Sequence, residues 1–388
     1  MNRPPLIGID GRKLKDFGIG SYIRHLLEAI GRNPESQNYR FRVYVRRSDG
    51  DSLPALPAQF EAAMEDAAGY SLAEMTRFAW RLWRDRLDLF HATHYVLPPL
   101  FRSRAVVTIH DIIHVLYPQF LPSRAAHFYA RAMIRRALER ANRIITVSYN
   151  SKRDLMDYFG VEGSRVEVIY NGVSPAFRPD VPQEEQKRVA ARYGIPTPYL
   201  LFLGGEKPHK NIQNVVRAFG QARRQQTLAH SLVLAGPLPK DTARLEALLA
   251  ALDLAGSVRL PGIMEEADLP GLYAGADVFL YPTLYEGFGL PVIEAMACGT
   301  PVLTSSTSAL REIAGGFAYL VDPMDVDAIA RGIGVLTTDA KVRADLSELG
   351  KKRALDFSWD KAAEKTLEVY AAALRRTREG GRGTRPPS

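Results

Sequence analysis

The sequence predicts an α/β protein made of two parallel-sheet halves of similar size. Short apolar strands alternate with helical stretches along nearly the whole chain, and this alternation is typical of a parallel sheet covered on both faces. The pattern is interrupted once, by the proline-rich stretch VIYNGVSPAFRPDVPQ at 168–183. A chain of 388 residues is also longer than a usual single domain. We therefore expect two Rossmann-like domains, with ligands bound in the cleft between their sheets.

The first predicted domain covers residues 1–178 and is followed by a linker at 179–198. Its first strand, LIGID (6–10), leads through the glycine turn FGIGS (17–21) into the helical pattern YIRHLLEAI. The further predicted strands are YRFRVYV (39–45), LDLFHA (87–92), RAVVTIHD (104–111) and RIITVS (143–148).

The second predicted domain covers residues 199–356. Its predicted strands are YLLFLGG (199–205), SLVLAG (231–236), VRLPG (258–262), ADVFLYPT (276–283) and TPVLTS (300–305). A final helix at 357–376 follows the sheet pattern without belonging to it, and we expect it to pack back toward the first domain. The basic tail at 377–388 has the composition of a disordered segment.

Charge and cysteine content narrow the class of protein. The formal charge of +8 favours anionic partners, such as phosphorylated metabolites, nucleic acid or an acidic membrane surface. A single cysteine excludes an internal disulfide framework and suits a reducing compartment. MNRPPLIGID lacks a secretory apolar region, and no apolar run approaches the roughly 18 residues of a membrane span. We expect a cytoplasmic protein.

The stretch LYEGFGLPVIEAMACGTP (284–301) carries the strongest functional signal. It predicts a helix with Pro291 as its first residue and Gly299 as its stop. Gly287 and Gly289 before it form a turn whose backbone can approach a ligand closely. The free amides at such a helix start favour an anion, most naturally a phosphate.

Two glutamates flank this turn, Glu286 before it and Glu294 in the first turn of the predicted helix. A carboxylate can accept paired hydrogen bonds from the hydroxyls of a sugar, so the motif suits a ligand that combines phosphates with sugar hydroxyls. The alternative is that both acids are only favourable charges near a helix N-terminus.

Three further motifs follow predicted strands. GGEKPHKN (204–211) offers Lys210 as a counter-charge for phosphates, and TIHDIIH (108–114) places His110 and Asp111 where functional groups gather. In FGIGS only Gly18 and Gly20 fit the dinucleotide pattern, because Ile23 stands where a third glycine belongs.

Together these motifs resemble the retaining glycosyltransferases of family 4, which have the GT-B fold. The resemblance runs from about residue 6 to about 370 and rests on FGIGSYIRHLL, TIHDIIHVLYP, VSYNSKRDL, VIYNGV, FLGGEKPHKN, LVLAGP and EGFGLPVIEAMACGTPV. The segments HDIIHVLYP and NSKRDL are most similar to bacterial mannosyl- and rhamnosyl-type members of surface polysaccharide assembly.

The resemblance implies roles for individual residues. It implies that Glu294 binds the ribose of a nucleotide-sugar, Glu286 contacts the donor sugar, Lys210 neutralises the leaving diphosphate, and His110 lies at the reacting sugar. The remaining implied donor contacts are Gly18, Gly20, Gly205, Lys207, Phe288, Gly289 and Leu290. The family commonly carries an arginine beside its phosphate lysine, where this chain has Gly205 or Glu206 and His209, so Lys207 is the expected substitute.

The implied activity is transfer of a hexose, preferably mannose, from a nucleotide-sugar to a saccharide or lipid-linked saccharide acceptor. GDP-mannose is the preferred donor and a UDP-sugar remains open. We expect metal-independent transfer, because Lys210 and a helix N-terminus can stabilise the leaving group. Front-face attack, with the leaving phosphate accepting the acceptor's proton, would retain the configuration.

Other functions remain open from the sequence. His91, His94, His110 and His114, with Asp111, could form the site of a metal-dependent hydrolase, although the helix of the zinc-protease pattern is missing. A non-catalytic nucleic-acid-binding module would explain the charge, but no recognition motif is present. The arginine-rich stretches Arg77–Arg86 and Arg124–Arg143 suit either an acidic membrane surface, on the inner face of the plasma membrane, or a solvated basic face.

Overall fold

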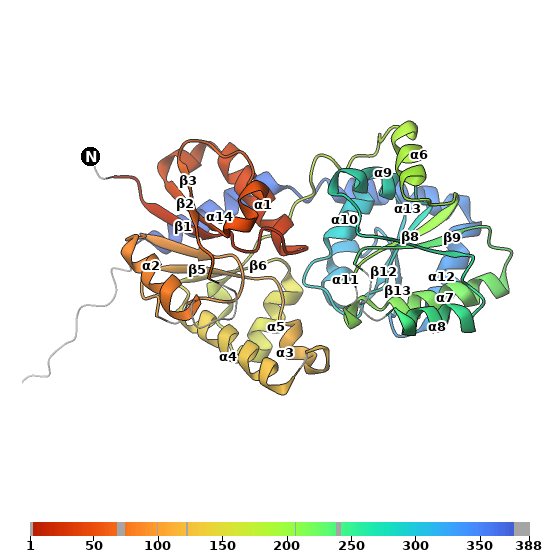
Figure 1. Ribbon diagram of the computed structural model, residues 1–388, viewed down its shortest axis with the longest axis horizontal. Coiled ribbons are helices and arrows are strands. Elements are labelled where there is room, and N and C mark those ends of the chain that lie inside the picture. Colours follow the sequence, from red (N-terminus) through yellow and green to blue (C-terminus); the bar gives the residue numbers. More distant parts are fainter. Residues whose placement is uncertain are drawn as a thin grey trace, which may run out of the picture.

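The computed structural model describes residues 3–67, 74–98, 100–121, 123–205, 207–237 and 242–375. The predicted tail at 377–388 and Glu206 lie outside these residues. The described chain forms two α/β domains that lie side by side, the first coloured red to yellow and the second green to blue (Figure 1). The predicted fold class is confirmed, because each domain is built on a wholly parallel sheet.

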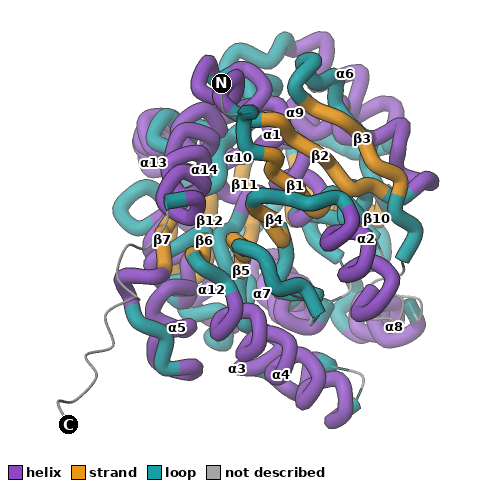
Figure 2. The backbone as a smooth tube through the Cα atoms, turned by 90° about the vertical axis from the view of Figure 1, so that its left-hand side faces the viewer, coloured by secondary structure: helices purple, strands orange, loops and turns teal. Residues whose placement is uncertain are grey.

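The sheet of the first domain has seven strands in the order β3-β2-β1-β4-β5-β6-β7, which can be followed from upper right to left in Figure 2. Their bounds are β1 Leu6–Asp10, β2 Arg40–Val45, β3 Phe60–Met64, β4 Leu89–Ala92, β5 Ala105–Ile109, β6 Arg143–Thr146 and β7 Val166–Val168. The sequence did not predict β3 and β7. Both are edge strands, and β3 is largely exposed while β7 has three residues, so neither leaves a buried apolar run.

Helices cover both faces of this sheet. Helices α1 (Ile19–Arg32) and α14 (Trp359–Leu374) pack on one face, around a core that includes Ile7, Val43 and Tyr370. Helices α2 (Ala79–Arg84), α4 (Arg124–Arg140) and α5 (Tyr149–Phe159) cover the other face, and the short α3 (Ile113–Leu116) contacts α4. The last helix of the chain therefore leaves the second domain and packs on the first (Figure 1).

The sheet of the second domain has six strands in the order β10-β9-β8-β11-β12-β13. Their bounds are β8 Tyr199–Leu203, β9 Ser231–Ala235, β10 Val258–Gly262, β11 Val278–Tyr281, β12 Val302–Ser305 and β13 Tyr319–Val321. The three-residue edge strand β13 was not predicted. Helices α7 (Ile212–Gln225), α8 (Ala243–Ala251) and α12 (Val326–Thr338) pack on one face of the sheet, and α6 (Gln183–Arg192), α9 (Leu269–Ala274) and α10 (Leu290–Ala297) pack on the other. The remaining α-helices of the described residues are α11 (Ser308–Ala314) and α13 (Ala340–Ala354).

The topology brings the ends of the two sheets together. Strand order reverses between β1 and β4 and between β8 and β11, and loops at such reversals form ligand sites in open α/β sheets. A small apolar cluster joins the domains there. Val147 of the first domain packs in it with four residues from later in the chain: Phe288, Ile293, Ile313 and Phe357. The loops that carry the predicted site residues meet at this junction.

None of the described helices is both long enough and apolar enough to cross a lipid bilayer.

Candidate functional site

The turn between β11 and α10 has the shape that the sequence predicts, with two corrections. Gly289 precedes the helix with a φ of 102°, and Gly299 follows it with a φ of 76°. Residues other than glycine rarely adopt such positive φ values. Leu290, and not Pro291, is the first helical residue. Glu294 lies beyond the first turn, which contains no acidic residue, so the interpretation of this acid as an N-terminal helix charge is wrong.

Lys210 and Glu286 form the polar centre of the second domain's site. The Lys210 Nζ lies 2.9 Å from the Glu286 Oε1 and donates a 2.6 Å hydrogen bond to the Tyr281 hydroxyl. The same hydroxyl donates to the Glu286 carboxylate at 3.2 Å. Burial alone would lower the pKa of Lys210, but the Glu286 carboxylate and Tyr281 raise it above its ordinary value. Lys210 is therefore a fixed positive charge at this end of the sheet.

Glu294 lies further along α10 and faces α9. The Tyr273 hydroxyl donates a 2.9 Å hydrogen bond to its Oε2. Burial raises the pKa of Glu294 to about 7, although the Tyr273 hydrogen bond opposes the shift. The carboxyl group therefore changes charge near neutral pH.

His110 comes from the first domain and lies against the turn that carries Glu286. Its Nε2 donates to the Thr93 carbonyl oxygen at 3.0 Å, and since a carbonyl only accepts, the Nδ1 of the neutral ring carries no proton. Burial lowers the pKa of His110 to about 4, so the ring is neutral at physiological pH. A Cβ added to Gly287 would come within 2.3 Å of the His110 carbonyl oxygen, so the two loops pack closely at this glycine.

The other predicted glycines have different roles. Gly18 precedes α1 with a φ of 66°, is exposed, and would meet no atom within 4 Å if it carried a Cβ. A Cβ on Gly20 would lie 2.2 Å from the Leu14 carbonyl oxygen, so glycine is needed there for the packing of the loop itself. Gly205 is partly buried against Pro237 after β8, and Lys207 is exposed.

Phe288 and Leu290 direct their side chains into the protein. Phe288 packs with Tyr170 and Phe357 in the junction cluster, and Leu290 packs against the core of the first domain. Both side chains are held by apolar contacts at the junction. The structure thus brings Lys210 and Glu286 into direct contact and His110 against Gly287, whereas Gly20, Phe288 and Leu290 support the loops.

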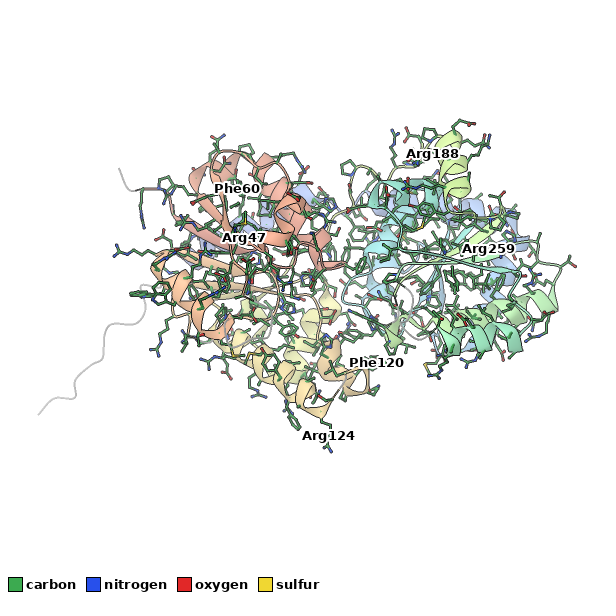
Figure 3. The ribbon with its side chains drawn as sticks, viewed as in Figure 1. Arg47, Phe60, Phe120, Arg124, Arg188 and Arg259 are labelled. Carbon is green, nitrogen blue, oxygen red and sulfur yellow. The ribbon has the colours of Figure 1, made fainter. Side chains whose placement is uncertain are left out.

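Sequence reasoning missed several residues of this site. Tyr281 and Tyr273 hydrogen-bond to the two glutamates, yet as aromatic residues of a buried strand and a buried helix they look like core. Tyr285 donates a 2.6 Å hydrogen bond to Asp154 across the junction. Phe120 also reaches the junction, with its ring centroid 6.1 Å from that of His209, and its label in Figure 3 lies on the side of the first domain that faces the second. The position of Tyr281 at the carboxyl end of a predicted strand could have indicated that it belongs to the site.

The histidine alternative is wrong for the residues that the structure describes. Among them, no three His, Cys, Asp or Glu side chains gather as a metal ion would require. His91 is fully buried in the core, where its Nδ1 lies 2.6 Å from the Tyr370 hydroxyl and its Nε2 lies 2.7 Å from the Thr108 hydroxyl. Both ring nitrogens of His91 are therefore engaged by protein groups.

Comparison with known proteins places these features in a family. Residues 18–177 match a family model described as Glycosyltransferase Family 4, and residues 184–353 match one described as Glycosyl transferases group 1. The chain is 32% identical over 306 residues to the O-antigen chain mannosyltransferase B of Escherichia coli, covering 78% of each protein.

Two further comparisons extend this result. The chain is 34% identical over 251 residues to the D-inositol 3-phosphate glycosyltransferase of Salinispora arenicola, a stretch that spans 60% of this chain but 55% of that relative. The fold resembles the sucrose-phosphate synthase of Thermosynechococcus elongatus with a TM-score of 0.77 and 22% identity, covering 95% of this chain and 99% of that one.

Proposed function

Because the chain belongs to glycosyltransferase family 4, we propose that it transfers a mannosyl group from a nucleotide-sugar to a saccharide or lipid-linked saccharide, with retention and without a metal ion. The observation that carries this proposal is the partly buried ion pair between Lys210 and Glu286, next to the turn where Gly287 packs against the His110 main chain across the domain junction. The preference for mannose is supported by the name of the E. coli relative.

The chemistry follows from the charges at the site. In the proposed step the bond between the sugar C1 and the phosphate oxygen breaks, and the acceptor hydroxyl oxygen bonds to C1 from the same face. The departing phosphate takes the proton of that hydroxyl. Lys210 and the amides at the start of α10 would stabilise the diphosphate, and Glu286 would accept a hydrogen bond from a sugar hydroxyl.

His110 and Glu294 would act at the two ends of the donor. The neutral His110 ring cannot repel the positive charge that develops at C1, and its unprotonated Nδ1 can accept a hydrogen bond. Glu294 would accept from the ribose hydroxyls in its ionised form. A UDP-sugar donor fits the same groups, because none of them contacts the base in this scheme.

A thermal-shift titration tests the donor proposal. GDP, UDP and ADP are added, each with and without EDTA, to the wild type, to Glu294→Ala and to the control Glu348→Ala, whose exposed side chain pairs with Lys351 of the same helix. A ligand at 100 times its dissociation constant stabilises the fold by about 2.7 kcal/mol. We expect one nucleotide to raise the melting temperature of the wild type and the control with EDTA present, and to have no effect on Glu294→Ala. If no nucleotide shifts the wild type, the proposal is wrong.

We further propose that the outer surface of α2 and α4 binds an acidic membrane. Both helices cover the same face of the first sheet, and their outward sides carry Trp80, Trp83 and Phe128, which are 55%, 70% and 60% exposed. Helix α4 contributes five exposed arginines and one acid, and Arg124 projects from the lower edge of the first domain in Figure 3. Exposed aromatic and basic side chains together suit the headgroup region of an anionic bilayer.

Vesicle co-sedimentation tests this surface. We expect binding to phosphatidylglycerol-containing vesicles that weakens with salt and is lost in Trp80→Ala/Trp83→Ala and in Arg131→Glu/Arg135→Glu. The control Arg217→Glu changes an exposed arginine of the second domain and should leave binding unchanged. Equal binding by all variants would show that this surface is only a solvated basic face.

A further inference from the structure

Helix α5 begins at the domain junction, where a side chain of the second domain, that of Glu312, binds the first two amides of the helix. The Tyr149 amide donates to the Glu312 Oε1 and the Asn150 amide donates to the Glu312 Oε2, both at 2.9 Å. The Ser148 hydroxyl accepts from the next amide, that of Ser151, at 3.0 Å. The first turn of α5 has no acidic residue of its own, so Glu312 supplies the negative charge that a helix N-terminus favours.

The Glu312 carboxylate is held by further groups. The Tyr170 hydroxyl donates a 2.7 Å hydrogen bond to its Oε1. The Arg353 guanidinium donates to the main-chain oxygens of Glu312 and Ile313 at 3.2 and 2.9 Å, which fixes the end of α11. Hydrogen bonds to an ionised acceptor are stronger than neutral ones, so this is a well-anchored contact between the domains.

The other end of α11 is hydrogen-bonded to the turn between β11 and α10 that carries Glu286, which we call the donor-site turn. The Glu286 amide donates to the Ser308 hydroxyl at 3.2 Å, and the Ala309 amide donates to the Glu286 carbonyl oxygen at 3.4 Å. Helix α11 therefore links the main chain of Glu286 to the start of α5, and the two helices are in contact at the junction between the domains (Figure 1).

Helix α5 in turn contacts the loop of His110. The Ser151 hydroxyl lies 3.0 Å from the His110 carbonyl oxygen and 3.4 Å from that of Gly287, so it lies between the two loops. One turn later, Asp154 accepts the hydrogen bond of Tyr285. The same short helix thus contacts the histidine loop, the donor-site turn and, through Glu312, the helix that supports that turn.

We propose that Glu312 is a positioning residue for the transfer reaction. By binding the two amides of α5 it keeps the His110 loop against the turn of Gly287, and so aligns the first domain's part of the site with the donor. The inference rests on the proposed function, because it assigns Glu312 to the same reaction. It predicts that loss of the contact slows turnover while the nucleotide, to which Lys210 and Glu294 of the second domain are assigned, binds as before.

The first experiment compares Glu312→Gln with the control Glu348→Gln, which removes the same charge from an exposed position on α13. Turnover and nucleoside diphosphate affinity are measured for each, with radii of gyration from small-angle X-ray scattering. We expect Glu312→Gln to lower kcat at least tenfold, to change the dissociation constant less than twofold, and to enlarge the radius of gyration. The control should match the wild type.

A second variant approaches the contact from the first domain. Proline is well tolerated at the first position of a helix, and Ser148 before it already has the extended backbone that a following proline requires, with φ −157° and ψ 158°. Tyr149→Pro therefore removes one amide donor, while the control Tyr149→Ala removes the exposed ring and keeps the amide. We expect Tyr149→Pro to lower kcat, Tyr149→Ala to leave it near wild type, and Tyr149→Pro combined with Glu312→Gln to be less than additive.

The outcomes separate the two proposals. If the wild type neither binds a nucleoside diphosphate nor turns over a nucleotide-sugar, the proposed function fails. If the wild type is active and the folded Glu312→Gln and Tyr149→Pro variants keep kcat within twofold, the positioning role is overturned and the proposed function stands.

Discussion

Substituting Gly287 by alanine tests the geometry of the domain junction most directly. The backbone of Gly287 does not have a left-handed φ, so alanine introduces no backbone strain and acts through space alone. Its Cβ would lie 2.3 Å from the His110 carbonyl oxygen and 2.9 Å from the Asp111 Cβ. Ordinary contact begins near 3.4 Å, so the His110 loop and the turn would have to separate by about 1 Å.

The magnitude follows from that displacement. A misplacement of about 1 Å at a reacting centre can reduce the rate about 100-fold, which corresponds to about 2.7 kcal/mol in the activation barrier. The groups assigned to the nucleotide, Lys210 and Glu294, belong to the second domain and do not move with His110. We therefore expect Gly287→Ala to lower kcat about 100-fold and to change the nucleoside diphosphate dissociation constant less than twofold.

The assay is release of nucleoside diphosphate from the nucleotide-sugar that the thermal-shift titration selects, together with calorimetric titration of the diphosphate. Gly256→Ala is the matched control, because a Cβ there meets nothing within 4 Å. A Gly287→Ala protein that melts near the wild-type temperature and keeps kcat within twofold would refute the reasoning. A fall in nucleotide affinity equal to the fall in kcat would also count against it.

Three further predictions concern single groups. Burial raises the pKa of Glu294 from its ordinary 4.5 to about 7, so the carboxylate that should bind the ribose is lost as pH falls through 7. We expect calorimetry to show weaker nucleotide binding at pH 6 than at pH 8 for the wild type, and no such pH dependence for Glu294→Gln. Lys210→Met should weaken nucleoside diphosphate binding about 10- to 100-fold and leave nucleoside binding unchanged, since a hydrogen bond to a charged group is worth about 1.5–3 kcal/mol; equal affinities in both proteins would contradict it. Trp359→Ala should reduce the free energy of unfolding, measured by urea denaturation, by about 3–5 kcal/mol, because this buried side chain joins α14 to the first domain. A loss below about 1 kcal/mol would be inconsistent with that packing.

The sequence predicts the regular parts of this protein because they leave local patterns. Buried parallel strands such as Leu6–Asp10 and Tyr199–Leu203 are continuous apolar runs, and the glycine and proline positions around α10 mark a turn and a helix start. The edge strands β3, β7 and β13 leave no such run. They are short or partly exposed, and only pairing with a neighbouring strand makes them strands.

The contacts that define the site are not local, and this limits what the sequence can show. The Lys210 Nζ meets Tyr281 and Glu286 from 71 and 76 residues away, and Glu312 meets α5 from 162 and 163 residues away. The spacing of histidines in the sequence also misleads where the local secondary structure points their side chains away from a common site. His91 and His94 are possible metal ligands by sequence, but β4 directs His91 into the core against Tyr370 on the last helix of the chain.

The division of these groups between the domains separates binding from chemistry. Lys210, Glu286 and Glu294 all lie in the second domain and are held by its own tyrosines, so the charges assigned to the nucleotide-sugar do not need the first domain for their arrangement. His110 is held by the first domain, through Thr93, and meets the donor-site turn only where Gly287 and α5 allow it. Changes to these second-domain groups should therefore act mainly on affinity, whereas changes to the contacts between the domains, at Gly287, Glu312 or the Tyr149 amide, should act mainly on turnover.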